Sequence, residues 1–304
     1  MLANKIAFPG TDLKLSRVTA GVMNWGVWGK KLDVQGMNRL IHACLDMGIS
    51  SFDHADIYGH YTTESHFGEA LKQSPGLSQQ LQIITKCGIK LTTPNRPSHR
   101  IKSYDTSREH IIASAERSLS NLSVEQIDVF LVHRPSPLME AEEVAEAFRL
   151  LHESGKVRYF GVSNFSPSQM QLLAKAHKLI TNQVQASILH LDPFFDGTFD
   201  LCQQWEIPAM IWSPVAGGSV FRNPTDPRNT RINQVLEELS ERQVGRTPQK
   251  LLYAWLFAHP AKLIPVVGTT NLERLRSTTE ALELELTREE WFMILEASLG
   301  KEVP

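Results

Sequence analysis

Short apolar runs alternate with amphipathic stretches along almost the whole chain, and this alternation constrains the fold more than any other feature. Repeated pairs of a strand and a helix favour a parallel sheet that is covered by helices. Eight such pairs are present, enough to close the sheet into a (β/α)8 or TIM barrel. We predict strands at residues 18–23, 49–52, 81–87, 127–132, 157–162, 183–186, 209–212 and 263–267, and helices at residues 33–47, 63–72, 107–119, 141–154, 166–177, 198–205, 231–243, 248–258 and 272–282.

Additional segments flank or interrupt the predicted barrel. Residues 6–8 and 13–15 flank the turn sequence Pro9-Gly10-Thr11-Asp12, which predicts an N-terminal β-hairpin acting as a lid or plug. A tail helix is expected around Trp291-Phe292. The connections 89–105 and 216–229 are longer than a barrel requires, and long loops after strands usually shape a binding site. We expect a single barrel domain over residues 1–304.

Composition and charge argue against several other classes of protein. The chain has 42% hydrophobic and 21% charged residues and a formal net charge of −2, without the basic excess that binds nucleic acid or anionic membranes. Its three cysteines are too few and too scattered for a disulfide framework, and no apolar run approaches the roughly 18 residues of a membrane span. His54, His60 and His66 lack metal-ligand spacing, so no metal site is expected. We expect a cytoplasmic protein that acts on a small molecule as a monomer or weak homo-oligomer.

Four polar residues lie at or just past the ends of predicted strands: Asp53, Tyr58, Lys86 and His133. The parallel strands of a barrel deliver such residues to one rim. A lysine ammonium beside a phenol favours the phenolate, so we expect Lys86 to lower the pKa of Tyr58 from about 10. Asp53 would hold Lys86 charged, and His133 would donate a hydrogen bond to a substrate oxygen. The sequence therefore predicts a proton-transfer site.

Longer motifs surround these four residues. They are Asp53-His54-Ala55-Asp56-Ile57-Tyr58-Gly59, Lys86, Val132-His133-Arg134-Pro135, the segment GKVRYFGVSNF at residues 155–165, Asn182-Gln183-Val184 and Trp212-Ser213-Pro214. Together they resemble the active-site signatures of the aldo-keto reductase superfamily over nearly the whole chain. Cys87-Gly88 after the lysine, with Trp291-Phe292, is most similar to the bacterial YdhF-like oxidoreductases of that superfamily.

The resemblance implies an NADPH-dependent oxidoreductase that reduces aldehydes or ketones to alcohols. Hydride would pass to the carbonyl carbon while Tyr58, as general acid, protonates the oxygen. Arg274 would bind the adenosine 2′-phosphate and favour NADPH over NADH, and Trp25 and Trp28 would line the substrate pocket. The cofactor contacts implied in this way are Gly21, Val22, Met23, Ser163, Asn164, Gln183, Trp212, Ser213, Pro214, Val215, Ala216, Gly217, Gly268, Thr269, Thr270, Arg274, Ser277 and Thr278.

The chain also departs from the patterns of better-known relatives. Ser277 and Thr278 stand where many members of the family carry a glutamate and an asparagine that read the adenine. Ala186 replaces an aromatic residue, and His54 replaces a small hydroxyl residue beside Asp53. No GxGxxG motif is present, which argues against a Rossmann fold and leaves the barrel rim as the dinucleotide site.

Structural alternatives exist for the residues at the rim. Asp53 and Lys86 could form an ion pair with a purely structural role. Ser163 and Asn164 could cap the helix that begins near Ser166. In the same way, Arg274 could be solvated, Gln183 could be a plain barrel-interior amide, and Trp25, Trp28 and Trp212 could be core residues.

Two other functions also stay open. The chain could be an NADPH-binding regulatory module with weak or no turnover, as potassium-channel β subunits of this superfamily are. It could instead be a barrel lyase or aldolase that forms a Schiff base on Lys86. Turnover of a carbonyl substrate with NADPH, and trapping of a carbonyl compound on Lys86, distinguish these functions from a reductase.

Overall fold

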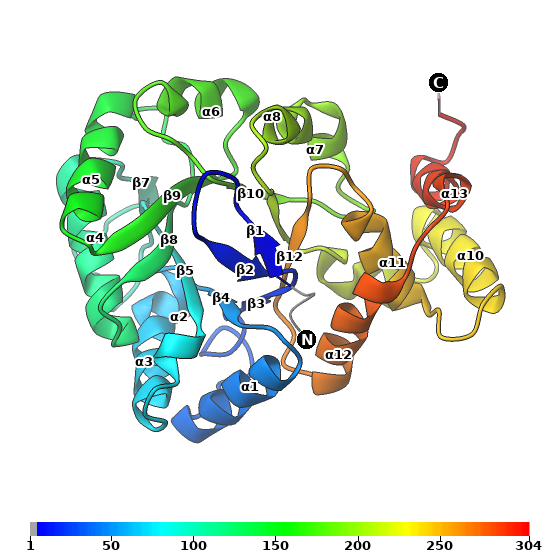
Figure 1. The fold of residues 1–304 in the computed structure, drawn as a ribbon, viewed down its shortest axis with the longest axis horizontal. Helices are drawn as coiled ribbons and strands as arrows, with labels where there is room; N and C mark the ends of the chain where they lie inside the picture. Colours follow the sequence, from blue (N-terminus) through cyan, green and yellow to red (C-terminus); the bar gives the residue numbers. More distant parts are fainter. Residues whose placement is uncertain (1–4, 304) are drawn as a thin grey trace.

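Eight parallel strands close into a barrel, and their order around the ring follows their order along the chain (Figure 1). The computed structural model describes residues 5–303. β12 pairs with β3, with Val266 opposite Thr19, and this pairing closes the ring. The predicted (β/α)8 barrel is confirmed, and each predicted strand end lies within two residues of the observed one. The barrel strands are β3 (Thr19–Gly21), β4 (Ser51–Asp53), β5 (Gln82–Cys87), β8 (Ile127–Val132), β9 (Val157–Ser163), β10 (Asn182–Gln185), β11 (Met210–Trp212) and β12 (Ile264–Val267).

Helices surround the barrel (Figure 1). Most begin where the sequence supplies a capping residue: the side chains of Asp33, Ser107, Ser166 and Thr247 accept hydrogen bonds from the first turn of the helix that follows. The helices are α1 (Val34–Asp46), α2 (Tyr58–Tyr61), α3 (Thr63–Lys72), α4 (Arg108–Leu122), α5 (Ala141–Glu153), α6 (Pro167–Ala174), α7 (Asp192–Phe195), α8 (Thr198–Gln204), α9 (Ser219–Arg222), α10 (Pro227–Glu241), α11 (Pro248–Phe257), α12 (Leu272–Glu280) and α13 (Arg288–Leu299). None of the helices among residues 5–303 is long and apolar enough to cross a membrane.

One helix begins earlier than its apolar pattern predicts. The predicted helix at residues 231–243 is α10, which starts at Pro227. The Asp226 side chain accepts hydrogen bonds from the backbone N–H groups of Arg228 and Asn229. A capping aspartate followed by proline is a strong signal for a helix start, and it lies upstream of the first buried residues of this helix.

The N-terminal hairpin plugs the amino-terminal end of the barrel. β1 (Lys5–Ala7) and β2 (Lys14–Ser16) pair antiparallel, and Figure 1 shows them across one end of the ring. The backbone N–H of Ser16 donates to the Ser51 hydroxyl, at the start of β4, over 2.9 Å. The apolar side chains of the hairpin form one buried cluster with side chains from the barrel strands and the segments that precede them: Ile6, Phe8, Leu13 and Leu15 with Ile84, Val129, Leu131, Ile180, Met210, Ile264 and Val266.

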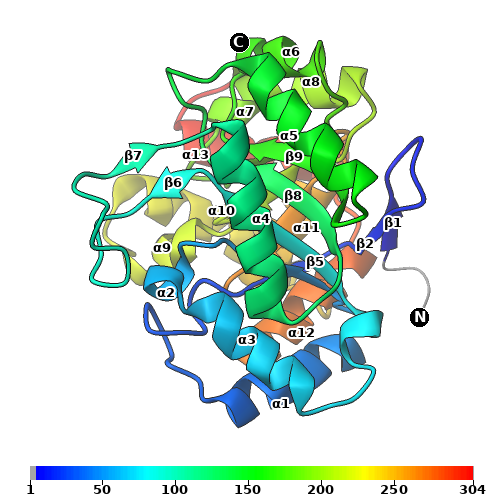
Figure 2. The ribbon, with the colours of Figure 1, turned by 90° about the vertical axis from the view of Figure 1, so that its left-hand side faces the viewer.

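The long connection after β5 carries a small sheet of its own. β6 (Ile89–Lys90) pairs antiparallel with β7 (Ser103–Tyr104), so the segment 89–105 is a structured projection beside α2 and α4 (Figure 2). The Tyr61 hydroxyl donates to the Ile89 carbonyl at 3.2 Å and accepts from the Leu91 N–H at 3.0 Å. This projection is therefore attached to the segment that follows Tyr58.

Candidate active site

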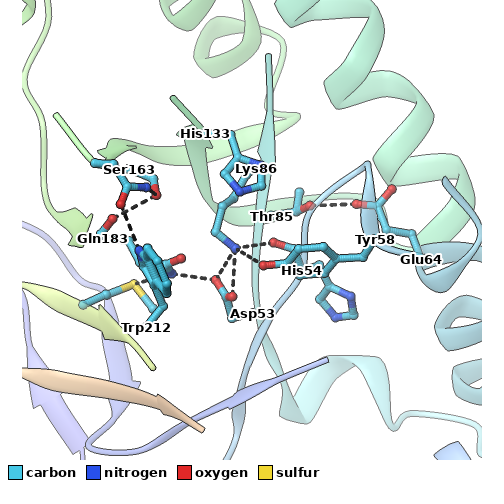
Figure 3. Close-up of polar contacts among 12 residues, drawn as sticks. Asp53, His54, Tyr58, Glu64, Thr85, Lys86, His133, Ser163, Gln183 and Trp212 are labelled. Atoms are coloured by element: carbon cyan, nitrogen blue, oxygen red, sulfur yellow. Dashed lines mark hydrogen bonds and ion pairs between the residues drawn. The ribbon is translucent and has the colours of Figure 1, made fainter. Parts of the chain in front are cut away.

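Lys86 is the centre of a buried polar cluster at the carboxyl-terminal end of the barrel (Figure 3). Its Nζ lies 2.8 Å from each carboxylate oxygen of Asp53 and 2.6 Å from the carbonyl oxygen of His54. The Tyr58 hydroxyl oxygen is 3.3 Å from the same Nζ. Lys86 and Asp53 are only 1% and 2% exposed. The predicted residues are thus brought together around one buried ammonium group.

The sequence did not predict the partner of Asp53 from the opposite side of the barrel. Gln183, at the start of β10, donates a hydrogen bond from its side-chain nitrogen to Asp53 Oδ1 over 2.7 Å. These residues are 130 positions apart in the chain, so only the closed ring reveals the contact. A buried carboxylate needs such donors, because burial without them is costly. Gln183 therefore gives the buried Asp53 side chain a second hydrogen-bond donor besides Lys86.

The expected direction of the pKa shift of Tyr58 is wrong. Burial raises the pKa of Tyr58 above its ordinary value of 10.0, and this outweighs the lowering by the neighbouring Lys86 ammonium. Burial lowers the pKa of Lys86, but Asp53 and Tyr58 raise it, and the net direction is upward. The phenol is therefore protonated and the lysine charged at neutral pH.

His133 follows β8 and lies beside Tyr58, with 6.3 Å between the two ring centroids. Burial, reinforced by the positive charges of Lys86 and Arg134, holds the pKa of His133 well below its ordinary value of 6.5. The imidazole is thus neutral and can donate one N–H. Its Nδ1 has no hydrogen-bond partner among the described residues.

A chain of polar groups runs along the rim from β11 to β10. The Trp212 indole N–H donates to Asn164 Oδ1 at 2.9 Å, and Asn164 Nδ2 donates to the Ser163 hydroxyl at 2.7 Å. That hydroxyl in turn donates to the Gln183 carbonyl at 2.9 Å. The helix α6 is capped by Ser166 instead, in a capping box with Gln169. Ser163 and Asn164 thus do not serve as its cap, which removes one of the structural alternatives.

The segments after β11 and β12 contain the remaining residues that were predicted to contact the cofactor. The backbone after β11 is left-handed at three positions, with positive φ angles at Ser213, Ala216 and Gly217. Positive φ angles are uncommon for residues other than glycine. After β12, Gly268, Thr269 and Thr270 are half-buried and lead into α12. Pro214 is buried, while Val215 and Ser277 are half-buried. These segments lie next to Trp212, because β11 and β12 are neighbours in the ring.

Arg274 lies in the first turn of α12 with an exposed side chain. Its backbone N–H donates to the capping Asn271 side chain at 2.9 Å. No carboxylate lies within ion-pair distance of its guanidinium in the part of the chain that the structure describes. A positive side chain near a helix N-terminus is suited to an anionic group.

Three of the predicted ligand contacts need correction. Val22 and Thr278 have no exposed surface, and the Thr278 hydroxyl donates to the Arg274 carbonyl within α12 at 2.8 Å. Trp25 is 1% exposed and packs edge-on against Phe52, with 6.1 Å between ring centroids. Val22 and Trp25 are core residues, because they pack in the main hydrophobic cluster, and the Thr278 hydroxyl is bonded within its own helix. Of the two other predicted contacts in this segment, Gly21 is buried at the end of β3 and Met23 is exposed.

Trp28, unlike Trp25, lies next to Tyr58. Its ring centroid is 6.1 Å from that of Tyr58 and 5.3 Å from that of His60, and its side chain is partly exposed. Sequence position did not separate it from Trp25, three residues earlier. The Trp28 ring therefore packs beside the candidate proton donor, Tyr58.

A second buried carboxyl group stands behind the cluster. Glu64 accepts a hydrogen bond from Thr85 Oγ1 at 2.7 Å (Figure 3). It accepts another from Ser118 Oγ at 3.1 Å. Burial raises the pKa of Glu64. The two hydroxyl groups that donate to Glu64 come from β5 and α4, which are far apart in the sequence. Because no local motif contains these residues together, the sequence analysis did not identify Glu64.

The whole chain is similar to proteins of one known family. A model of the aldo/keto reductase family matches residues 17–298. The uncharacterized oxidoreductase YcsN of Bacillus subtilis (strain 168) is 46% identical over 295 residues, which cover 96% of this chain and 97% of that protein. Oxidoreductase YdhF of Escherichia coli (strain K12) is 42% identical over 306 residues, covering 100% of both. The expected likeness to YdhF-like oxidoreductases is thereby confirmed.

Two further comparisons concern an enzyme and a solved structure. The 6-dehydroglucose reductase of Agrobacterium fabrum (strain C58 / ATCC 33970) is 40% identical over 295 residues, 96% of this chain and 97% of that enzyme. The structure of the glycerol dehydrogenase AKR11B4 from Gluconobacter oxydans superposes with a TM-score of 0.84 at 24% identity, covering 100% of this chain and 98% of that one. At that identity the likeness concerns the fold.

Proposed function

Because the chain belongs to the aldo/keto reductase family, we propose that it is an NADPH-dependent oxidoreductase that reduces an aldehyde or ketone to an alcohol. The observation that carries this proposal is the position of the Tyr58 hydroxyl. It lies 3.3 Å from the Nζ of Lys86, whose charge is balanced by Asp53 in a site almost closed to water. Such a hydroxyl can give up a proton, because the resulting phenolate would be stabilised at once by the neighbouring ammonium group.

Three residues would act on the substrate oxygen or on its proton. Tyr58 is protonated at rest and delivers its proton to the carbonyl oxygen. Neutral His133 orients that oxygen by donating a hydrogen bond, and Lys86 stabilises the phenolate that Tyr58 becomes. Asp53 keeps Lys86 in place with two oxygens at 2.8 Å. NADPH, when bound, supplies the hydride.

The residues at the rim fit a dinucleotide. Ser163 and Asn164 present a hydroxyl and an amide at the barrel mouth, suited to a carboxamide, and the partly exposed Trp212 offers a ring face for stacking. The segment 213–217 would hold the pyrophosphate with its backbone, and residues 268–270 would contact the adenosine. Arg274 would bind the 2′-phosphate and give preference for NADPH.

The other two functions have less support. The Lys86 ammonium contacts Asp53, the His54 carbonyl and Tyr58, and its pKa is raised, so it is not an available nucleophile for a Schiff base. A regulatory module without turnover would not need the proton donor Tyr58 beside a buried ammonium group.

The name of the 40% identical relative points to oxidised sugars as substrates to test first.

The test is NADPH oxidation by the purified protein against oxidised sugars, simple aldehydes, ketones and quinones, with NADH in parallel. Tyr58→Phe should lower turnover by about 10²- to 10⁴-fold, the usual contribution of a general acid, while NADPH affinity is kept. Tyr159→Phe, at the plugged end, is the matched control. Full turnover in Tyr58→Phe would refute the mechanism, and tight NADPH binding by the unmodified protein without any turnover would favour the regulatory module.

A further inference from the structure

A cavity lies outside the catalytic cluster, between the projection 89–105, the segment that follows Tyr58 and α4. Figure 2 shows α2, β6 and α4 next to one another in this part of the molecule. The cavity has a volume of about 280 Å³ and is lined by Asp56, Tyr61, Lys90, Arg96, His99, His110 and Arg117. None of the four catalytic residues lines it.

Positive charge predominates among the side chains that line this cavity. Lys90 is paired with Asp105 at 3.4 Å, and Asp105 also faces His110 at 3.7 Å. Arg96 and Arg117 have no carboxylate within ion-pair distance among residues 5–303. In that part of the chain the guanidinium groups donate only to neutral partners, Arg96 to the Asn95 carbonyl and Arg117 to the Ser114 hydroxyl. Two arginines therefore line a concave space without an ion-pair partner among the described residues.

Asp56 provides a second, independent observation. Its side chain is 9% exposed and lines the cavity, and its Oδ1 has no hydrogen-bond partner among the described residues. Buried polar atoms of this kind are rare in folded proteins and call for a partner. Burial, together with the negative charge of Glu64, raises the pKa of Asp56 well above its ordinary value. This shift favours the protonated form of Asp56, in which the carboxyl group can donate an O–H to an anion.

We propose that this cavity binds a phosphate group between the guanidinium groups of Arg96 and Arg117, with the Asp56 carboxyl group as a further donor. A phosphate accepts hydrogen bonds from several directions at once, which suits donors that come from a loop, from α4 and from the segment after β4. Lys90, held by Asp105, contributes charge at the edge. The phosphate could be free or be part of a phosphorylated small molecule.

The residues around the cavity contact the segment of residues 59–61, which directly follows Tyr58. Asn95 Nδ2, next to Arg96, donates to the His60 carbonyl at 2.8 Å, and the Arg96 guanidinium lies 4.6 Å from the centroid of the Tyr61 ring. Gly59, His60 and Tyr61, directly after the candidate proton donor, all have positive φ angles. Such a backbone persists only when its surroundings hold it. A phosphate bound between Arg96 and Arg117 therefore holds the segment that positions Tyr58.

Calorimetric titration of the full chain with inorganic phosphate, in a chloride buffer, tests the proposal without any need for turnover. We expect saturable binding with one site, which Arg96→Gln and Arg117→Gln each weaken at least tenfold. Arg149→Gln is the matched control, because Arg149 is exposed on α5 and paired with Glu146 and Glu153. Glucose 6-phosphate in a second titration distinguishes the sources: tighter binding indicates a phosphate ester and weaker binding indicates free phosphate.

Amide hydrogen exchange locates the site independently of any variant. Added phosphate should slow exchange in residues 58–62 and 89–105. Three results would overturn the proposal: no saturable binding in the millimolar range, equal weakening by Arg149→Gln, or loss of binding in Arg274→Gln with slowed exchange near residues 271–278. The last result would place the phosphate in the cleft proposed for NADPH.

Discussion

The two ends of the barrel are built from the same strands and have opposite chemistry. β5 carries Ile84 in the apolar cluster under the hairpin and, two residues later, Lys86 in the polar cluster. Alternate residues of a strand share a face, so both side chains point toward the barrel interior. The change from core to reaction site thus takes place over about 7 Å of one strand. The apolar end can therefore be perturbed without the chemistry, whereas a change in the polar cluster affects both chemistry and stability.

Lys86→Met should perturb both properties and have the largest effect. Turnover should fall by about 10²- to 10⁴-fold, because the phenolate loses its stabilising charge. The free energy of unfolding should fall by about 3–5 kcal/mol, because Asp53 is left buried with a single donor, Gln183. NADPH oxidation and urea unfolding measure these effects.

The double variant Asp53→Asn/Lys86→Met is the control for that result. It removes the uncompensated charge, so stability should recover in part while turnover stays low. Recovery of turnover would contradict the role assigned to Lys86, and no recovery of stability would show that packing, not charge, is what was lost.

Leu15→Ala should perturb the plugged end alone. Leu15 belongs to the apolar cluster between the hairpin and the strands and is fully buried. Its truncation should therefore lower the free energy of unfolding by about 2–5 kcal/mol. Turnover per folded molecule should stay within about twofold, since the catalytic residues keep their partners. Leu138→Ala, at a side chain that is 88% exposed, is the control and should change neither quantity. A large loss of turnover in Leu15→Ala would show that the two ends are coupled.

His54→Leu should change how stability responds to acid. Burial, which is the larger cause, and the charge of Lys86, which is the smaller one, together lower the pKa of His54 to about 3 in the folded protein. In the unfolded chain the pKa of this histidine is near its ordinary value of 6.5. Below pH 6.5 the unfolded state therefore binds a proton that the folded state does not, and stability falls with pH until about pH 3. The loss of stability between pH 7 and pH 5 should be smaller by about 2 kcal/mol in the variant. An unchanged acid dependence in urea unfolding would contradict a neutral buried His54.

The smallest effect concerns the pH profile of reduction. Between 6.5 and 10.0, the ordinary pKa values of histidine and tyrosine, neutral His133 and protonated Tyr58 should both persist, so kcat should change little. Oxidation of the alcohol needs the phenolate, and its rate should rise with pH up to and beyond 10.0. Stopped-flow measurement of hydride transfer in both directions checks this. A bell-shaped profile for reduction, centred near neutrality, would indicate another acid.

Residues with local signals could be predicted from the sequence. The strands and most helices follow from alternating apolar runs and capping residues. The candidate catalytic residues stand at or just past strand ends, where a barrel presents them. The contact of Gln183 with Asp53 has no local signal, since it depends on ring closure. The direction of the pKa shift of Tyr58 depends on burial, which a neighbouring lysine in the sequence does not reveal.

The two tryptophans show the same limit at closer range. Trp25 and Trp28 stand on one loop after β3, yet only Trp28 reaches the candidate site. Their directions are set by the turns of residues 22–32, where the Lys30 N–H donates to the Asn24 carbonyl and the Leu32 N–H to the Trp25 carbonyl. No periodicity applies within such a loop, so residue type alone could not separate core from pocket.

The plug has a consequence for the biosynthesis of the protein. Its apolar side chains lie within the first 15 residues, but their partners include Ile264 and Val266. A ribosome adds these partners roughly 250 residues later, about 10 to 50 s at ordinary translation rates. During that interval the cluster around Ile6, Phe8, Leu13 and Leu15 is incomplete, so apolar surface stays exposed on the growing chain and can aggregate.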